Sequence, residues 1–403
     1  MRLGRAAALA LATAVAASAL AAAPATAGTA FARTASDARP QPRLVTITIP
    51  APHGEIAAKW LPYSGPPRAN VLLPAGYDPA KRYPLIVVLN GLNTDYSWWH
   101  DWKLDVPLEA LHAIVVMPEG ASGWYTDWWN DGKRGDPSWE SYELDTVLPT
   151  ILERYLILPQ RRYHALLGVS MGGMGSAYLG GRLPGFFGSV GILSGFVDPQ
   201  YFAPIADAFM EATSLAPLKG DEDLLSVEGR PYGFYMRGHN PTQLVMNLRQ
   251  TRVFESTGNG APSPVAAYNT PGSEEEGVAI YPMSQRFHRA AVAAGVDISY
   301  HEHTGGHDIP DFLREVEAYV RWDPFEPVIT RPTSWTNETV ATHGQLWDIG
   351  YRFAKPPTRV VQFSRTLNRL SISDAGSDVT LTTSGGCTIH TGTPATVWVP
   401  RHC

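Results

Sequence analysis

The sequence predicts an α/β protein: a mainly parallel sheet with helices on both faces, followed by a small β-rich domain. Strand patterns and amphipathic helix patterns alternate over residues 44–326, and such alternation is typical of parallel sheets whose crossovers are helices. The segment from Leu85 to Leu89 is apolar at every position, as expected for a strand that is buried on both faces. Beyond Pro324 the helical period disappears and Thr/Ser-rich alternating segments follow.

The composition of the 403-residue chain excludes three classes of protein. Its 38 acidic and 32 basic residues give a net charge of −6, which excludes a nucleic-acid-binding protein built on basic patches. Apolar residues make up 44% of the chain, so it can bury a large core and is not disordered. The 37 Gly and 34 Pro indicate many loops and not a helical bundle.

The first 27 residues predict a secretory signal peptide. A basic start precedes an uncharged, Ala- and Leu-rich run over residues 6–22, and Ala25-Thr26-Ala27 provides a small-x-small cleavage motif. A membrane anchor is the alternative, but the run is short and gives way to Pro24 and small polar residues. We expect cleavage after Ala27, a flexible leader over 28–43, and a secreted protein that does not span a membrane.

Periodicity predicts the elements of the large domain, residues 44–326, in order. The predicted strands cover 44–49, 70–73, 85–89, 114–117, 163–169, 190–193, 251–254 and 297–303. The predicted helices cover 139–155, 172–183, 284–294 and 311–320. Because parallel strands share the edge at which they end, we expect functional groups to gather in the loops at that edge.

Residues 327–403 predict the appended β-rich domain. Alternating patterns predict strands over 359–363, 370–372, 379–382 and 396–399. The chain has two cysteines, Cys387 and Cys403, and both lie in this domain. In an exported protein a disulfide between them would enclose 15 residues and stabilise the domain by about 3 kcal/mol.

The strongest catalytic motif is Gly168-Val169-Ser170-Met171-Gly172, which lies between a predicted strand and a predicted helix. That context is the one a nucleophile elbow needs, in which a strained turn exposes the serine of an α/β-hydrolase. The turn is so tight that the positions two before and two after the serine must lack a large side chain, and here both are Gly. We therefore predict Ser170 as the nucleophile and the backbone N–H of Met171 as one oxyanion donor.

Three histidines, His301, His303 and His307, lie close together at the end of the last predicted strand. In α/β-hydrolases the chain order is nucleophile, acid, histidine. His307 follows Gly305-Gly306 in the loop after that strand, so we predict it as the base. A three-histidine metal site is the alternative, but no nearby carboxylate pattern completes it. We expect no metal and no organic cofactor.

The acid of the triad is not identified by its spacing. Residues 258–272 contain no Asp or Glu, and the first candidates after the seventh strand are Glu274, Glu275 and Glu276. Three consecutive glutamates are also what a solvated turn contains, so the residues alone leave this choice open.

Further short motifs occur in a specific order, and together they carry a resemblance. They are Asn90-Gly91-Leu92, Tyr125-Thr126-Asp127-Trp128, Leu193-Ser194-Gly195-Phe196, Gly258-Asn259-Gly260 and Gly306-His307. With them, the chain from about Pro84 to Val320 resembles the antigen 85 mycolyltransferases and, more broadly, the esterase D and feruloyl-esterase group of α/β-hydrolases. In that family a Glu before Gly completes the triad, which implies Glu276 with Glu275 in reserve. The resemblance also supports the N–H of Leu92 as the second oxyanion donor.

The sequence departs from antigen 85 at positions that concern the substrate. Asn93 is the counterpart of an arginine that helps hold the sugar in that family, and Thr257 is the counterpart of a cysteine. The β-rich tail has no counterpart there. These departures leave the acyl-transfer residues in place and favour hydrolysis over transfer.

Seven of the 12 tryptophans lie between residues 98 and 139: Trp98, Trp99, Trp102, Trp124, Trp128, Trp129 and Trp139. Because they fall in loops at strand ends, we predict an apolar or sugar-stacking wall beside Ser170. The predicted substrate contacts are Asn93, Trp98, Trp99, Trp124 and Trp128. Aromatic packing beneath the loops is the alternative.

These residues predict two-step acyl transfer through Ser170, His307 and Glu276. The favoured function is a secreted serine esterase acting on acyl esters, with lipids and glycolipids among the candidate substrates. An acyltransferase that passes the acyl group to a sugar or glycerol hydroxyl is the alternative. A non-catalytic cell-wall or matrix-binding protein is a third hypothesis. The β-rich domain is a candidate contact for carbohydrate or cell wall, and no nucleic-acid partner is expected.

Overall fold

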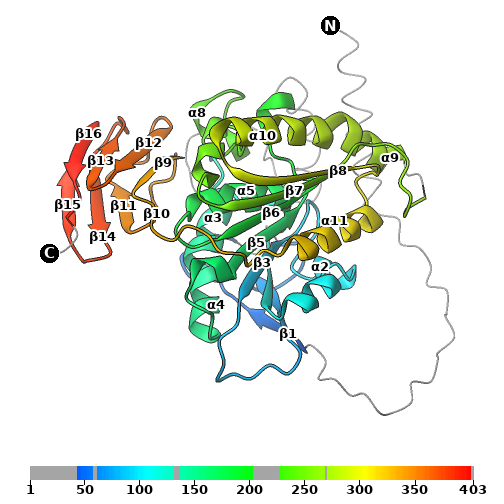
Figure 1. The fold of residues 1–403 in the computed structure, drawn as a ribbon. Coiled ribbons are helices and arrows are strands. Elements are labelled where there is room, and N and C mark those ends of the chain that lie inside the picture. The colour runs from blue at the N-terminus through cyan, green and yellow to red at the C-terminus, as the bar shows by residue number, and fades with distance from the viewer. Residues whose placement is uncertain (1–42, 58–60, 131–136, 203–226, 268–269, 401–403) are drawn as a thin grey trace, which may run out of the picture.

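A computed structural model describes residues 43–57, 61–130, 137–202, 227–267 and 270–400 (Figure 1). The predicted signal peptide, nearly all of the predicted leader, and Cys403 lie outside these ranges. No helix within the described ranges is both long enough and apolar enough to cross a membrane.

An eight-stranded sheet forms the centre of the large part, in the order β1-β2-β4-β3-β5-β6-β7-β8. Its strands are β1 (Arg43–Thr48), β2 (Arg68–Leu73), β3 (Leu85–Leu89), β4 (Ile114–Pro118), β5 (His164–Val169), β6 (Ser189–Leu193), β7 (Arg252–Gly258) and β8 (Asp297–His303). The six strands β4, β3, β5, β6, β7 and β8 pair with one another in parallel. At the sheet edge, β2 pairs antiparallel with β4, and β1 pairs antiparallel with β2. The predicted mainly parallel sheet is therefore confirmed.

Helices cover both faces of this sheet and leave a core on each side (Figure 1). Five of the helical elements are η2 (Val106–Leu111), α4 (Leu148–Arg154), α5 (Met171–Arg182), α10 (Tyr281–Ala294) and α11 (Ile309–Trp322). In β3, Leu85, Val87 and Leu89 pack into one core, while Ile86 and Val88 pack into the other. This two-sided burial is the reason that the strand is apolar at every position.

Further helical segments complete the large part. They are α2 (Trp98–Asp101), α3 (Trp139–Ser141), η4 (Tyr142–Val147), η5 (Arg161–Tyr163), η6 (Pro199–Phe202), α8 (Phe234–Arg237), η7 (Val245–Leu248), α9 (Thr270–Glu274) and η8 (Glu275–Ile280). The single helix predicted over 139–155 is thus three consecutive segments, and its middle segment η4 is a π-helix. The sequence did not predict this because a π-turn changes the period only locally.

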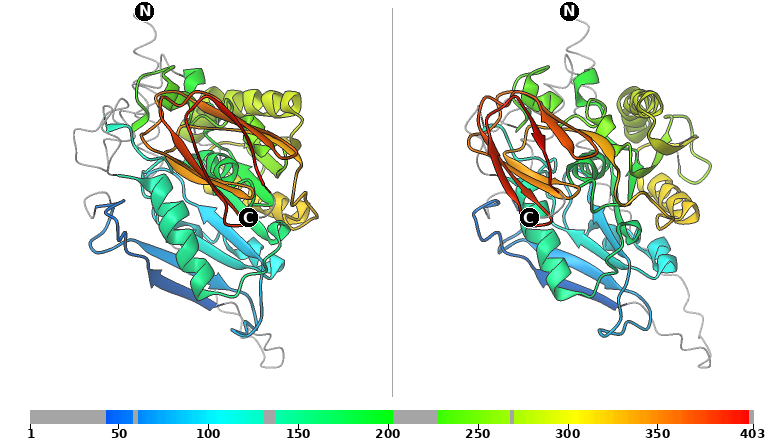
Figure 2. Two further views of the ribbon diagram at one scale, coloured as in Figure 1. Left: turned by 90° about the vertical axis from the view of Figure 1, so that its left-hand side faces the viewer. Right: turned by 60° about the vertical axis from the view of Figure 1, so that its left-hand side comes forward.

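The C-terminal part consists of two four-stranded antiparallel sheets, in the orders β10-β11-β14-β15 and β16-β13-β12-β9. The strands are β9 (Ser334–Thr339), β10 (His343–Leu346), β11 (Ile349–Phe353), β12 (Val361–Thr366), β13 (Arg369–Ile372), β14 (Val379–Thr383), β15 (Thr388–Thr391) and β16 (Ala395–Trp398). Figure 2 shows the two sheets as layers, and their facing side chains, among them Phe363 and Leu381, form a separate core. The predicted small β-rich domain is therefore confirmed.

The two parts are joined at the C-terminal end of α5. Arg182 pairs with the buried Glu140 of the large part and donates to Tyr351 Oη (2.9 Å) and to the His343 carbonyl (2.9 Å) of the β-rich part. Asn337 Nδ2 also donates to the Gly181 carbonyl, at 2.9 Å. Ser170 lies at the opposite end of this 12-residue helix, which corresponds to roughly 18 Å at 1.5 Å per residue.

Candidate active site

Ser170 lies in a strained turn between β5 and α5. Its backbone has φ 57° and ψ −118°, a region that non-glycine residues rarely adopt. A Cβ on Gly168 would lie 1.9 Å from the Gly172 carbonyl oxygen, and a Cβ on Gly172 would lie 2.3 Å from the Leu89 carbonyl oxygen. The two glycines of the motif are therefore required by close backbone approach, as the sequence pattern predicts.

Neighbouring strands hold this strained backbone in place. The Ser170 N–H donates to the Leu193 carbonyl at 2.9 Å, and the Ser170 carbonyl accepts from the Phe196 N–H at 3.1 Å. Both partners belong to β6 or to the loop that follows it. The turn is thus fixed from two sides, and the serine side chain is placed at the N-terminus of α5.

The two predicted oxyanion donors have free N–H groups. Neither the Met171 N–H nor the Leu92 N–H donates a hydrogen bond to another described residue. A Cβ on Gly91, next to Leu92, would lie 3.8 Å from Ser170 Cβ, so the loop after β3 runs beside the nucleophile. Both N–H groups are therefore available to an oxygen that is bound at Ser170.

Asn90 organises the loop that carries Leu92, a role that the sequence did not reveal. The residue is 1% exposed, and its Nδ2 donates to the Gly91 carbonyl at 2.9 Å and to the Ala121 carbonyl at 3.2 Å. Tyr125 Oη donates to the Asn90 carbonyl at 3.1 Å. This buried network fixes the backbone on which an oxyanion hole would depend.

His307 and Glu276 are in direct contact. His307 Nδ1 lies 2.7 Å from Glu276 Oε2. The backbone N–H of His307 donates to the Gly272 carbonyl at 2.9 Å. Phe312 packs against the imidazole at a ring-centroid distance of 4.9 Å and an interplanar angle of 86°. The ring is therefore oriented by a carboxylate on one side and by an aromatic residue on another.

Glu276 is fully buried, and both of its carboxylate oxygens have partners. Its Oε1 accepts from Thr257 Oγ1 at 2.8 Å and from Ser194 Oγ at 2.9 Å. Three partners from β7, the loop after β6 and the loop after β8 satisfy a carboxylate that would otherwise be costly to bury. Sequence reasoning noted Thr257 only as a departure from antigen 85 and did not identify its contact with the acid.

The three consecutive glutamates occupy different environments. Glu274 is exposed, whereas Glu275 and Glu276 are buried in η8. Glu275 Oε1 lies 3.7 Å from His307 Nε2, on the opposite side of the ring from Glu276. Burial disfavours the charged imidazole, but the two carboxylates outweigh burial and raise the pKa of His307 to about 9.

The other two histidines of the cluster have separate partners. His303 Nε2 lies 2.9 Å from Glu315 Oε1, and the ring of His301 stacks on Phe254 at 4.8 Å. The three histidines therefore do not converge. In the part of the chain that the structure describes, no group of three or more His, Cys, Asp or Glu side chains could hold a metal ion.

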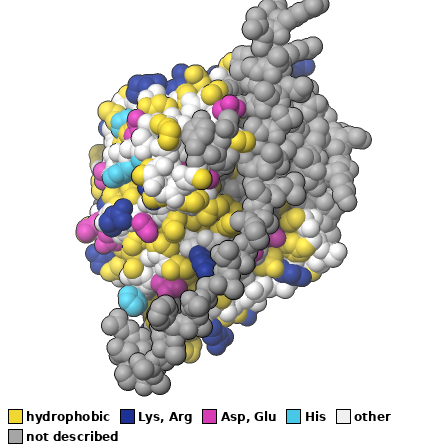
Figure 3. Space-filling view, turned by 90° about the vertical axis from the view of Figure 1, so that its right-hand side faces the viewer, with side chains coloured by type: hydrophobic (Ala, Val, Ile, Leu, Met, Phe, Trp, Pro, Cys, Tyr) yellow, Lys and Arg dark blue, Asp and Glu magenta, His cyan; other side chains and the backbone are white. Residues whose placement is uncertain are grey.

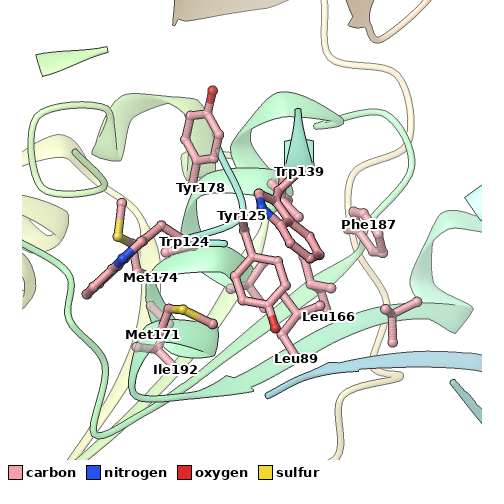
Figure 4. Close-up of a cluster of buried hydrophobic side chains, with 14 of the residues drawn as sticks. Leu89, Trp124, Tyr125, Trp139, Leu166, Met171, Met174, Tyr178, Phe187 and Ile192 are labelled. Carbon is pink, nitrogen blue, oxygen red and sulfur yellow. The ribbon is translucent and has the colours of Figure 1, made fainter. Parts of the chain in front are cut away.

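The predicted tryptophan wall needs correction. Trp99, Trp124 and Trp128 are 1%, 1% and 0% exposed, and Figure 4 shows Trp124 beside Met171 and Met174 in the core beneath the turn. These three rings stabilise the loops and cannot stack on a substrate, because apolar packing closes over them. Trp98 alone among the four is partly exposed.

Two of the predicted substrate contacts remain near the surface of the site. Trp98 packs edge-on against Phe312 at 6.3 Å, the same ring that contacts His307. Asn93 is partly exposed, and its Oδ1 accepts from Ser122 Oγ at 3.2 Å. Figure 3 views the side on which α9 and α11 lie, where hydrophobic side chains form a band across the described surface between charged groups.

The fold and this arrangement define the class of protein. A mainly parallel sheet places a serine turn after β5, a buried Glu after β7 and a His after β8 at one edge, as in an α/β-hydrolase. Residues 64–322 match the model of the Esterase family, which is described as "Putative esterase". The chain belongs to this family.

Curated relatives agree with this assignment. The chain is 27% identical over 256 residues to Esterase Rv1288 of Mycobacterium tuberculosis, covering 62% of this chain and 54% of that protein. It is 24% identical over 248 residues to the diacylglycerol acyltransferase/mycolyltransferase Ag85B of Mycolicibacterium smegmatis, covering 58% of this chain and 74% of that protein. The resemblance to the antigen 85 and esterase group is confirmed. The chain spans about half the length of Esterase Rv1288.

Solved structures share the fold. MPT51 (FbpC1) of Mycobacterium tuberculosis has a TM-score of 0.53 at 18% identity, and the match covers 70% of this chain and 98% of that chain. FphF, a fluorophosphonate-binding serine hydrolase of Staphylococcus aureus, has a TM-score of 0.51 at 15% identity, with coverages of 70% and 98%. At these identities the comparison establishes the fold.

Proposed function

We propose that the protein is a serine esterase that cleaves acyl esters through Ser170, His307 and Glu276. The observation that carries this proposal is the combination of a strained serine turn with a buried Glu276–His307 pair at the same sheet edge. The family, and relatives that are named as esterases and acyltransferases, support it.

The proposed reaction has two steps. Ser170 Oγ attacks the ester carbonyl carbon while His307 Nε2 accepts the hydroxyl proton, and the resulting oxyanion is bound by the N–H groups of Met171 and Leu92. Collapse breaks the ester C–O bond, His307 returns the proton to the leaving alkoxide, and an acyl-serine remains. Water then attacks this ester by the same route and releases the acid. Glu276, bound to Nδ1, stabilises the imidazolium in both steps.

An acyltransferase is the second candidate, because the similarity to Ag85B covers 74% of that protein. It would form the same acyl-serine and would differ only in the second step, where a sugar or glycerol hydroxyl replaces water. The outcome depends on whether an acceptor is held in position while water is excluded. Asn93, in place of the sugar-holding arginine of antigen 85, favours hydrolysis.

The substrate class and the location are further parts of the proposal. Hydrophobic side chains on the face that carries α9 and α11 support an ester with an apolar acyl chain, as in a lipid or glycolipid. The basic start, apolar run and Ala25-Thr26-Ala27 motif support export with cleavage after Ala27. We assign the C-terminal domain a binding role toward carbohydrate or cell wall.

The proposal is tested with the purified mature protein and p-nitrophenyl esters of graded acyl length, with and without glycerol or trehalose. We expect free acid as the main product and a loss of roughly 10⁴-fold or more in kcat for Ser170→Ala. A new acylated product with little free acid would favour the transferase. Absence of turnover on every ester would favour a non-catalytic binding protein.

A further inference from the structure

Glu275 lies against the catalytic face of His307 and has no role in a conventional triad. Glu276 already occupies Nδ1 at 2.7 Å, whereas Glu275 Oε1 lies 3.7 Å from Nε2, the nitrogen that must accept the proton of Ser170. The side chains of His307 and Glu275 are each 9% exposed. The imidazole therefore has a carboxylate at each of its two nitrogens.

The local helix geometry explains how two consecutive residues reach one imidazole. Glu275 and Glu276 open the π-helical segment η8, and the helix continues as α10 from Tyr281. A π-turn is wider than an α-turn and is frequent at functional sites. Glu274, one residue earlier, belongs to α9 and is exposed, so the burial of Glu275 is not a property of the whole glutamate triplet.

The main electrostatic influences on His307 come from carboxylates. Glu275 and Glu276 contact the imidazole from η8, and Glu315 of α11, which is itself paired with His303 at 2.9 Å, acts on it more weakly. Asp308 follows His307 in the chain and interacts with it electrostatically. Burial raises the pKa of Glu275, and the charge of His307 opposes that increase. The strong field of these carboxylates favours a proton on both imidazole nitrogens, and a doubly protonated imidazole cannot act as a base.

We propose that Glu275 is a positioning residue for His307, whose carboxylate retains a proton on Nε2 in the free enzyme and thereby sets the pH at which the esterase becomes active. The proposal rests on the assignment of His307 as the base. Loss of this proton at higher pH would free Nε2 to accept the proton of Ser170. The site would thus be largely inactive at neutral pH and would gain activity under alkaline conditions.

The test is the pH dependence of kcat/KM for p-nitrophenyl butyrate, because kcat/KM reports the ionisation of the free enzyme. The kcat/KM of the wild type is expected to fall as the pH drops through a midpoint of about 9. In Glu275→Gln the midpoint should move roughly one to three pH units lower, since a carboxylate within 4–6 Å shifts a pKa by about that amount. At pH 7 the kcat/KM of the variant should then exceed that of the wild type by about ten- to 100-fold. Glu274→Gln is the matched control and should leave the profile unchanged.

Two outcomes would overturn the proposal, and they differ from failure of the proposed function. An unchanged midpoint in Glu275→Gln would show that Glu275 does not control His307. Loss of turnover in Glu275→Gln with retention in Glu276→Gln would make Glu275 the triad acid, leaving the serine mechanism intact. If Ser170→Ala retained full turnover, the proposed function itself would fail.

A measurement that does not depend on turnover tests the proposal even if Glu275→Gln is inactive. In the inactive Ser170→Ala background, ¹⁵N-histidine NMR would follow the titration of His307 with and without Glu275→Gln. The same downward shift of the midpoint is expected. A His307 signal that titrates near pH 6.5 in both proteins would contradict the proposal.

Discussion

At the residue scale, hydrogen bonding to a fully buried carboxylate distinguishes Glu276 from Glu274 and Glu275. Glu274 is exposed and Glu275 contacts Nε2, but only Glu276 combines full burial with three hydrogen-bond partners. The residue types could not make this distinction, because three identical side chains carry no information about which one faces inward. The choice of Glu276 came from the resemblance to antigen 85.

Glu276→Gln should keep the site folded and remove most of the activity. The amide preserves the shape, but it cannot stabilise an imidazolium or hold the productive tautomer, so kcat should fall by about 10³–10⁴-fold. Steady-state kinetics on a p-nitrophenyl ester would measure the loss. The exposed Glu274→Gln should change kcat by less than about twofold, since surface substitutions rarely act at a distance. Equal losses in the two variants would contradict the assignment of Glu276.

At the element scale, the sequence predicts regular elements well and irregular ones poorly. The strand over 297–303 and the helices at α5, α10 and α11 appear within about three residues of their predicted bounds. The helices α10 and α11 each have a clear apolar period, whereas α5 is rich in Gly and buried at every position. The strand predicted over 251–254 continues to Gly258 as β7. Its last residues, Ser256 and Thr257, are polar and buried, and buried polar residues end an apolar pattern.

The π-helical segments and four strands of the C-terminal domain were not predicted. Both η4 and η8 interrupt helices whose composition is ordinary, and η8 positions the acid. In the C-terminal domain β9, β10, β11 and β15 were missed. In β9 two of the inward-facing residues, Asn337 and Thr339, are polar, so its alternation is not one of apolar and polar residues.

Gly172→Ala should destabilise the nucleophile turn strongly. The new Cβ would lie 2.3 Å from the Leu89 carbonyl oxygen, and backbone at that distance can move only by distorting β3. We expect a loss of about 3 kcal/mol or more, measured by urea unfolding. Gly392→Ala, whose nearest atom would be Asp378 Oδ1 at 3.5 Å, should cost less than about 1 kcal/mol. Equal stability of the two variants would show that the turn is not as tight as described.

At the scale of the whole molecule, a buried ion pair joins the two domains. Arg182 and Glu140 are 4% and 5% exposed in their side chains, and Arg182 also binds Tyr351 and His343 of the β-rich domain. Burial alone would raise the pKa of Glu140, but Arg182 outweighs burial and lowers the pKa below its usual range. The sequence predicted both domains but not this contact, because the partners are about 40 and 160–170 residues apart.

Arg182→Met should destabilise the protein by about 3–5 kcal/mol at pH 7, because it leaves Glu140 buried without its cation. The pKa of Glu140 is lower in the folded protein than in the unfolded chain, where it is about 4.3. The ion pair therefore stabilises the protein fully above about pH 4.3, and this stabilisation is lost as the pH falls further. The difference in unfolding free energy between wild type and variant should therefore shrink on acidification. Arg359→Met is the control, because its pair with Asp374 is 56% and 39% exposed and should contribute less than about 1 kcal/mol. Similar losses of unfolding free energy in Arg182→Met and Arg359→Met would contradict the conclusion that burial makes the Arg182–Glu140 pair important for stability.

The C-terminal disulfide remains a prediction. Cys387 is 4% exposed in the β-rich domain, and Cys403 lies outside the described residues. Peptide mapping of the purified protein without reduction should yield one cross-linked Cys387–Cys403 peptide. Reduction should lower the stability of this domain by about 3 kcal/mol. Recovery of both cysteines as free thiols would contradict the prediction.

The most direct test of a Ser170 nucleophile is covalent labelling with a fluorophosphonate, which traps an activated serine whatever the natural substrate is. The purified protein should take up one label per chain, and peptide mapping should place it on Ser170. Ser170→Ala should remain unlabelled, and His307→Gln should label at least about 10²-fold more slowly because it lacks the base. Labelling of another residue, or of Ser170→Ala to the same extent as the wild type, would contradict a Ser170-based mechanism.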